Sequence, residues 1–277
     1  MVQVALIVGG TSGIGFSVAE AIAQRGWQIN IVGMREEKGQ KAASALANAK
    51  FHKANVSDYD ELARVFHAVF NSFKRLDFVF ANAGIPEFVD LFAPRNDDEI
   101  PPKPGLDLLD INLNGALYTS YLAVHYFRRS PEHTRGNRNL IITSSIGGLY
   151  PCMLSPVYSG SKHALIGFVR SIGDRLFKEG IRVTTICPGV VKTPLLNEEL
   201  LSYFPEDVLI PIEAVTDVTM KTLAGGDLID SKGNQVPADK FHSQVLHITG
   251  QGFYFIDQPP IHDQEARSTW NAMMGWR

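Results

Sequence analysis

The chain has 277 residues, of which 45% are hydrophobic and 20% charged, so it can bury one large core as a single α/β domain spanning residues 1–277. Its formal net charge of -3 argues against the basic surface that binding to nucleic acid requires. The two cysteines, Cys152 and Cys187, belong to no pairing motif, which excludes a disulfide scaffold and suits a reducing compartment.

The sequence contains no stretch typical of a membrane span or a targeting signal. The apolar run at residues 4–8 is too short for a signal peptide, and no basic residue precedes it. No other apolar run approaches the length of a membrane-spanning helix. Metal-ligand spacings, repeats and low-complexity tracts are also missing from the sequence. We therefore expect a cytoplasmic protein with no membrane span and no metal.

The first elements in chain order are a strand, a glycine-rich turn and a helix. Residues 2–8 are mostly β-branched or aliphatic, apolar residues at helical spacing follow the turn, and residues 29–32 add a second strand. Glycines in such a turn let the backbone approach a pyrophosphate, whose charge then lies at the helix N-terminus; a tight structural turn is the alternative. The residues expected to bind a dinucleotide here are Gly9, Thr11, Ser12, Gly13, Ile14 and Gly15.

The end of the second strand indicates which dinucleotide is bound. A carboxylate at this position holds the ribose hydroxyls of NAD, whereas its absence beside an arginine suits the phosphate of NADP. Here Gly33 and Met34 follow the strand, and Arg35 comes next, with no acid among them. We therefore expect NADP, with Arg35 as the phosphate partner and NAD as the alternative cofactor. In the other interpretation Arg35 is a solvated residue that faces Glu36 or Glu37.

Two further strands lead to the rest of the expected cofactor site. Residues 51–56 end near the expected adenine position, and residues 77–81 lead into small residues that allow a cofactor to lie against the backbone. The alternation of apolar strands with helices favours a doubly wound parallel sheet, a Rossmann fold, of about seven strands with helices on both faces. The cofactor contacts expected here are Asn55, Val56, Asn82, Ala83 and Gly84.

The segment at residues 86–105 is rich in proline and acidic residues and looks inserted. It either borders the substrate site or is a solvated surface loop. A long helix is then expected over residues 106–126, although residues 112–115 interrupt it with asparagine and glycine, which are poor helix formers. Asn112 could kink this helix and hold a water with its freed backbone and side chain.

The next stretch places two reactive side chains one helical turn apart. Ser155 is the expected N-cap of a long helix, and Tyr158 and Lys162 lie on the same face of it. An ammonium one turn away, together with the positive helix end, should lower the pKa of the tyrosine from about 10 toward a range useful for proton transfer. Ser145, at the end of the preceding strand, would donate a hydrogen bond to the same substrate oxygen. Chance spacing is the alternative interpretation.

The remaining sequence is expected to complete the cavity. A strand over residues 181–186 precedes a Pro/Gly turn, and an apolar lid follows over about residues 194–242. Residues 245–249 supply a further strand, and a C-terminal tail at about residues 253–277 covers either the pocket or a contact between subunits. The cofactor contacts expected in the turn are Pro188, Gly189, Val191 and Thr193.

These motifs, in this order and at this spacing, resemble those of the classical short-chain dehydrogenase/reductase family across nearly the whole chain. Residues 156–194 and 245–253 are most similar to the 15-hydroxyprostaglandin dehydrogenase branch. The resemblance implies that Tyr158 is the general acid/base and that Lys162 lowers its pKa and binds the nicotinamide ribose. It further implies that Ser145 polarises the substrate oxygen, Asn112 holds a relay water and Thr193 contacts the carboxamide. A homodimer or homotetramer is implied by the same analogy.

Three positions depart from the family pattern. Val8 stands where Thr or Ser is usual, and Ala81 replaces the first Asn of Asn-Asn-Ala-Gly. Gly33 replaces the acid of NAD users, which favours NADP and carbonyl reduction. We therefore expect an enzyme that transfers hydride between NAD(P) and a small-molecule secondary alcohol or ketone, reducing a bulky apolar carbonyl. The alternatives are a non-redox isomerisation, dehydration or cyclisation at the same site, and a non-enzymatic dinucleotide-sensing interaction protein.

Overall fold

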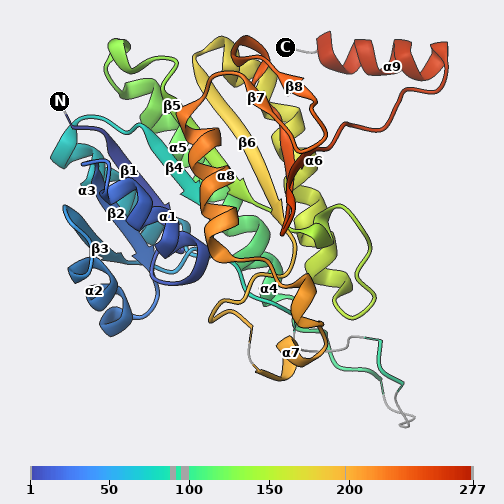
Figure 1. Cartoon of the computed structure of the whole chain (residues 1–277), viewed down its shortest axis with the longest axis horizontal. Coiled ribbons are helices and arrows are strands. Elements are labelled where there is room, and N and C mark those ends of the chain that lie inside the picture. Colours follow the sequence, from blue (N-terminus) through green and yellow to red (C-terminus); the bar gives the residue numbers. More distant parts are fainter. Residues whose placement is uncertain (1, 88–91, 95–99, 197, 276–277) are drawn as a thin grey trace.

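A computed structural model describes residues 2–87, 92–94, 100–196 and 198–275 of the chain. Its centre is an eight-stranded sheet with helices on both faces (Figure 1). The strands of this sheet are β1 (Val4–Val8), β2 (Gln28–Gly33), β3 (Ala49–Lys53), β4 (Phe78–Ala81), β5 (Arg138–Thr143), β6 (Ile181–Pro188), β9 (Val245–Thr249) and β10 (Gly252–Phe255).

The strand order is β10-β9-β6-β5-β4-β1-β2-β3, and all neighbours are parallel except β9 and β10. The chain runs outward from β1 to β3 and then returns to β4, on the other side of β1. This reversal puts a topological switch point between β1 and β4, where Val8 is opposite Ala81. In open α/β sheets, ligands bind beyond the carboxyl ends of the strands at such a point.

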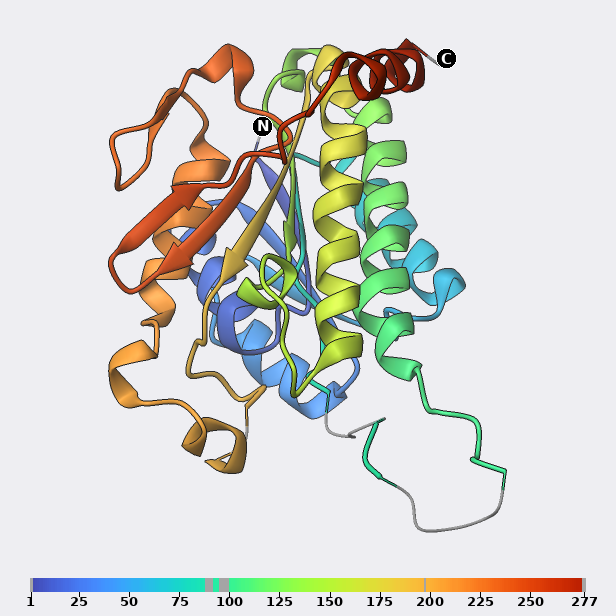
Figure 2. The ribbon, with the colours of Figure 1, turned by 90° about the vertical axis from the view of Figure 1, so that its right-hand side faces the viewer.

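Alternate side chains of each strand pack against different helix layers, as the period of a strand requires. On β1, Val4, Leu6 and Val8 face one hydrophobic cluster, and Ala5 and Ile7 face the other. Figure 2 shows α5 and α6 side by side on one side of the sheet and α8 on the other. The first layer consists of α3 (Tyr59–Phe73), α5 (Gly115–Arg129) and α6 (Pro156–Lys178). The second consists of α1 (Gly13–Ala23), α2 (Glu36–Ser44) and α8 (Ile212–Ala224).

Short elements connect these layers. They are α4 (Asp107–Leu109), the π-helix η1 (Asp110–Asn114), the 3-10 turns η2 (Glu132–Thr134), η3 (Ile146–Gly148), η4 (Glu206–Val208) and η5 (Ala238–Lys240), the helix α7 (Glu198–Ser202), and the hairpin of β7 (Leu228–Ile229) and β8 (Gln235–Val236). The helix α9 (Gln264–Gly275) follows β10 and buries none of its side chains. None of the described helices is long and apolar enough to cross a membrane.

The predicted fold class is confirmed, with differences at its edge. The sheet has one strand more than expected, because Gly252–Phe255 pairs with β9 instead of beginning a tail. Within the segment 194–242, where a lid is expected, α8 carries Val215 and Leu223 into the core. The helix expected over 106–126 is interrupted at η1, as its Asn and Gly predicted. Much of the segment 86–105 lies outside the described residues.

Candidate active site

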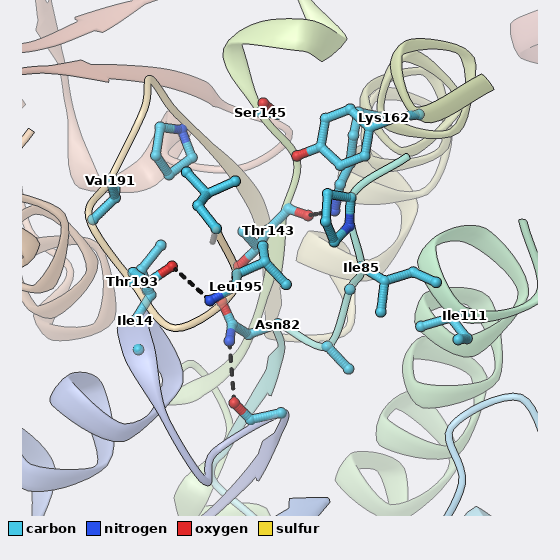
Figure 3. Close-up of a pocket in the computed structure, with 18 of the residues that line it drawn as sticks. Ile14, Asn82, Ile85, Ile111, Thr143, Ser145, Lys162, Val191, Thr193 and Leu195 are labelled. Atoms are coloured by element: carbon cyan, nitrogen blue, oxygen red, sulfur yellow. Dashed lines mark hydrogen bonds between the residues drawn. The ribbon is translucent and has the colours of Figure 1, made fainter. Parts of the chain in front are cut away.

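A cavity of about 740 Å³ opens beyond the carboxyl ends of the central strands, within the usual range for a small-molecule site (Figure 3). Nearly every residue predicted from the sequence lines it. Gly15 and Asn112 do not; they lie behind its wall. The predicted residues on the wall are Gly9, Thr11, Ser12, Gly13, Ile14, Arg35, Asn55, Val56, Asn82, Ala83, Gly84, Ser145, Tyr158, Lys162, Pro188, Gly189, Val191 and Thr193.

The glycine turn after β1 is packed backbone against backbone. Gly9 has φ +81, and a Cβ there would lie 2.7 Å from the main chain of Ala83. A Cβ on Gly15 would meet the carbonyl oxygen of Gly9. The following helix α1 begins after Ser12 without a side-chain cap and without an acid in its first turn. Its first amides therefore remain available to an anion, so this turn fits the pyrophosphate of a dinucleotide.

The cavity also extends to the end of β2, where Gly33 and Arg35 line it. A Cβ on Gly33 would lie 2.7 Å from Thr11 Cγ2, so the Thr11 side chain takes the space that an acid would need. Within residues 2–87, Arg35 forms no ion pair with Glu36 or any other acid. The pKa of Lys38, one turn along α2, is lowered by burial and then by the charge of Arg35. Two cations near each other favour an anionic ligand.

Asn82 joins three strands at the switch point. Its Nδ2 donates to the Gly9 carbonyl oxygen at 3.3 Å, and its Oδ1 accepts from Thr143 Oγ1 at 2.9 Å. Figure 3 shows Asn82 between the turn that follows β1 and the end of β5. The side chain thus holds the β1 and β5 ends together under the middle of the cavity. This bond to Thr143 matters because the Thr143 carbonyl also accepts from Lys162 Nζ, at 2.9 Å.

Asn112 is fully buried in the π-helix η1, and both polar atoms of its side-chain amide bond to the main chain of Ile85. Its Oδ1 accepts from the Ile85 amide at 2.8 Å, and its Nδ2 donates to the Ile85 carbonyl oxygen at 2.9 Å. This pair of bonds fixes the segment that follows β4. Both polar atoms of the side-chain amide are thus bonded to Ile85, and the water expected at Asn112 stays a prediction.

Tyr158 and Lys162 lie one turn apart on α6, as predicted. Lys162 Nζ is 5.7 Å from the centre of the Tyr158 ring. Ser145 lines the same cavity as Tyr158, and its hydroxyl accepts from the Gly147 amide at 3.1 Å. Lys162 is only 3% exposed, and Figure 3 shows it on the same side of the cavity as Ser145. The arrangement brings a phenol, a hydroxyl and an ammonium to one wall.

The expected lowering of the Tyr158 pKa is wrong for the chain by itself. Burial raises the pKa of Tyr158, and the nearby Ser145 hydroxyl opposes this shift only in part. Burial also lowers the pKa of Lys162 to about 8. Both side chains are buried away from water, which disfavours their charged forms. In addition, the Lys162 ammonium donates to the Thr143 carbonyl oxygen and not to the phenol.

One residue of this wall was missed by the sequence interpretation. Glu87, two residues beyond Ile85, lines the cavity and accepts a 2.7 Å hydrogen bond from the Tyr158 amide through Oε2. Ser155 occupies the N-cap position of α6, as predicted, but makes no side-chain capping bond. No local signal identifies Glu87, because it is 71 positions from Tyr158 and follows a strand in a segment expected to be a loop.

The end of the cavity beyond Tyr158 is apolar. Residues of the expected lid contribute to its wall, and Leu195 and Phe204 keep 43% and 37% of their surface exposed. Cys152 also lines this end and is partly exposed, whereas Cys187 is buried, which raises the pKa of its thiol to about 12. The apolar residues of this end are Ile85, Ile146, Tyr150, Leu195, Leu196, Leu200 and Phe204.

Comparison with known proteins gives a consistent result. The model of the short chain dehydrogenase family matches residues 3–202. The short-chain dehydrogenase/reductase prx7 of Penicillium rubens is 37% identical, over 94% of this chain and 95% of its own. The 15-hydroxyprostaglandin dehydrogenase (NAD+) of Rattus norvegicus is 35% identical, over 92% of this chain and 94% of its own. A crystal structure of an actinorhodin polyketide ketoreductase with NADPH has a TM-score of 0.73 at 22% identity, and covers 90% of this chain and 96% of its own.

The chain belongs to the short-chain dehydrogenase family, as its sequence motifs predicted. It is an oxidoreductase that transfers hydride between a nicotinamide dinucleotide and an alcohol or ketone. The predicted similarity to the 15-hydroxyprostaglandin dehydrogenase branch is also confirmed.

Proposed function

We propose that this enzyme reduces a bulky, largely apolar ketone with NADPH, and that Tyr158 donates the proton. The observation that carries the proposal is the placement of Tyr158, Ser145 and Lys162 together on the wall of the cavity that also contains the glycine turn. When bound along the glycine turn, NADPH would supply the hydride for the carbonyl carbon. The phenol gives its proton to the carbonyl oxygen, so that the products are the secondary alcohol and NADP+.

The other side chains of the wall assist this transfer. Ser145 donates a hydrogen bond to the carbonyl oxygen and so orients the substrate beside the phenol. Lys162 holds the nicotinamide ribose and places a positive charge near Tyr158, which favours the phenolate that forms when the proton leaves. We infer that Asn112, whose side-chain amide is bonded to Ile85, holds a relay water.

Tyr158→Phe tests the proton donor. Proton transfer by a positioned side chain contributes roughly a hundredfold to ten-thousandfold, and the variant should lose about that much of its turnover. Affinity for NADPH should stay nearly unchanged, because the ring remains in place. The measurement is single-turnover oxidation of NADPH with a panel of bulky ketones, beside a fluorescence titration of the cofactor. Turnover at the level of the unaltered enzyme would contradict the assignment of Tyr158.

The choice of NADP is supported by Gly33, whose neighbourhood is filled by Thr11, and by the two cations Arg35 and Lys38. Titration by nicotinamide fluorescence should show NADPH binding at least about tenfold more tightly than NADH, a free-energy difference of about 1.4 kcal/mol. Arg35→Ala should remove most of this difference by weakening NADPH alone. If NADH binds more tightly to the unaltered enzyme, the interpretation of Gly33 and Arg35 is wrong.

The small-molecule substrate is proposed to be a ketone large enough to contact Leu195 and Phe204 together. The relatives named above include a dehydrogenase for a hydroxyprostaglandin and a neighbour in fold that reduces polyketides, according to their names. A homodimer or homotetramer and a cytoplasmic location stay predictions. Both roles considered for the tail, covering the pocket and contact between subunits, stay predictions.

A further inference from the structure

The helix that carries Tyr158 and Lys162 has no cap from its own N-cap residue. Ser155 takes the N-cap position with φ -147 and ψ 62, and its side chain forms no capping bond. The first amides of a helix have no acceptor within the helix and need one from elsewhere. Tyr158 is the third residue of α6, so its main-chain amide is one of these donors.

Glu87 supplies the missing acceptor from a distant part of the chain. Its Oε2 atom accepts from the Tyr158 amide at 2.7 Å, a length typical of a charge-assisted bond. A carboxylate is also favoured at this end of a helix by the helix dipole. Among the described residues, the second oxygen, Oε1, is buried without a hydrogen-bond partner. Within that part of the chain, the carboxylate is thus bonded to the Tyr158 amide alone.

The same short segment is fixed at its other end by Asn112. Ile85 is bonded to the Asn112 amide through both its N–H and its carbonyl oxygen. Two residues further on, Glu87 is bonded to Tyr158. The residues 85–87 therefore form a bridge between the π-helix η1 and the first turn of α6, and they line the same cavity as Tyr158.

We propose that Glu87 is a positioning residue for Tyr158, acting as the N-cap that α6 lacks. The bond is to the main chain of the tyrosine itself, so losing it frees the first helical turn and displaces the phenol from Ser145. A misplacement of about 1 Å can reduce turnover by about a hundredfold. The structural part of this proposal stands on the hydrogen bond alone, whereas its effect on turnover rests on the proposed function of Tyr158.

Two variants separate the bond from the charge. Glu87→Gln keeps an oxygen of the same reach and removes the charge, whereas Glu87→Asp keeps the charge and is one methylene too short. We expect Glu87→Gln to retain turnover within about threefold and Glu87→Asp to lose about tenfold to a hundredfold in kcat. Affinity for NADPH should change by less than about twofold in both, since neither variant alters the glycine turn.

Amide exchange gives a readout that does not depend on turnover. In protein labelled at tyrosine, NMR should show the Tyr158 amide proton exchanging at least about tenfold faster in Glu87→Asp than in Glu87→Gln. Asp263→Ala is the matched control, because Asp263 accepts a 2.8 Å bond from the Ala266 amide and caps α9 in the same way, away from the cavity. It should leave Tyr158 exchange and kcat unchanged.

These measurements test the capping role of Glu87 and the proposed function of the enzyme separately. Equal Tyr158 exchange rates in Glu87→Asp and Glu87→Gln would overturn the capping role. Loss of kcat in Glu87→Gln with retention in Glu87→Asp would show that the charge acts, and would also overturn it. If the unaltered enzyme oxidises NADPH with no ketone of the panel, the proposed function fails, while the exchange rates still decide whether Glu87 positions Tyr158.

Discussion

The two ends of the cavity are built in different ways. At the dinucleotide end, Gly9 and Gly15 bring main chain against main chain so closely that a Cβ has no room. At the substrate end, the wall consists of side chains such as Leu195 and Phe204, which keep a large part of their surface exposed. In the proposed function, the cofactor position is thus fixed by backbone packing that few substitutions can alter, whereas substrate choice depends on side chains that can be exchanged.

Lys162 lies where the two ends of the cavity meet, and its substitution should have the largest effect on turnover and on unfolding free energy. The folded-state pKa of this lysine is about 8, below its ordinary 10.5, because of burial. Below pH 8 the folded protein therefore holds a buried cation, at a cost of up to roughly 3 kcal/mol of unfolding free energy. Between pH 8 and 10.5 the unfolded chain binds more protons than the folded one, so this cost disappears as the pH rises.

Lys162→Met should therefore stabilise the protein below pH 8 and lose this advantage by about pH 10.5. Its turnover should fall by at least about a hundredfold, since the cation beside the phenol is gone. Urea unfolding at a series of pH values, together with NADPH oxidation, measures both. A variant that is less stable than the unaltered protein at pH 7 would show that the bond to Thr143 outweighs the burial of the charge.

The glycine turn has no room for a Cβ atom on Gly15, so an alanine there should destabilise the protein. Gly15→Ala forces a Cβ against the Gly9 carbonyl oxygen, which is backbone and cannot rotate away. We expect a loss of about 1–3 kcal/mol in unfolding free energy and a large loss of NADPH affinity. The matched control is Gly167→Ala in α6, where a Cβ meets nothing within 4 Å and should be neutral or stabilising by about 0.5–1 kcal/mol. Equal effects of Gly15→Ala and Gly167→Ala on unfolding free energy and NADPH affinity would contradict the idea that backbone packing fixes the dinucleotide end.

A substitution at the substrate end of the cavity should have a smaller effect, and it should change KM alone. Phe204→Ala removes a half-exposed ring from the apolar wall, and we expect KM for a bulky ketone to rise by roughly tenfold, or about 1.4 kcal/mol. The Kd of NADPH should not change. Ile229→Ala, an exposed apolar residue on β7 away from the cavity, is the control and should leave KM unaltered. A change in cofactor affinity with Phe204→Ala would mean that the two ends are coupled.

The sequence allowed correct prediction of the parts of the site that depend on local spacing. A glycine turn between a strand and a helix, and a tyrosine and lysine four positions apart on one helix, follow from backbone geometry alone. The π-helix around Asn112 was foreshadowed by its poor helix formers. Each of these features lies within a few residues of its cause.

The remaining features depend on contacts between distant segments. Glu87 and Tyr158 are 71 positions apart, and a serine at the N-cap suggested that no other cap was needed. The strand β10 was missed because four residues next to a turn carry little signal until β9 offers an edge. The pKa of Tyr158 was misjudged because helical spacing gives the position of Lys162 Nζ relative to the helix, but not its bond to Thr143.

The two cysteines provide a chemical reporter for the substrate end. Cys187, with a pKa of about 12 and no exposed surface, has almost no thiolate at neutral pH and should resist alkylation. Cys152 is partly exposed and lines the apolar end of the cavity. A fluorescent maleimide should therefore attach once, at Cys152, and a ketone that fills this end should slow the labelling, so that candidate ligands can be ranked before any reaction is observed.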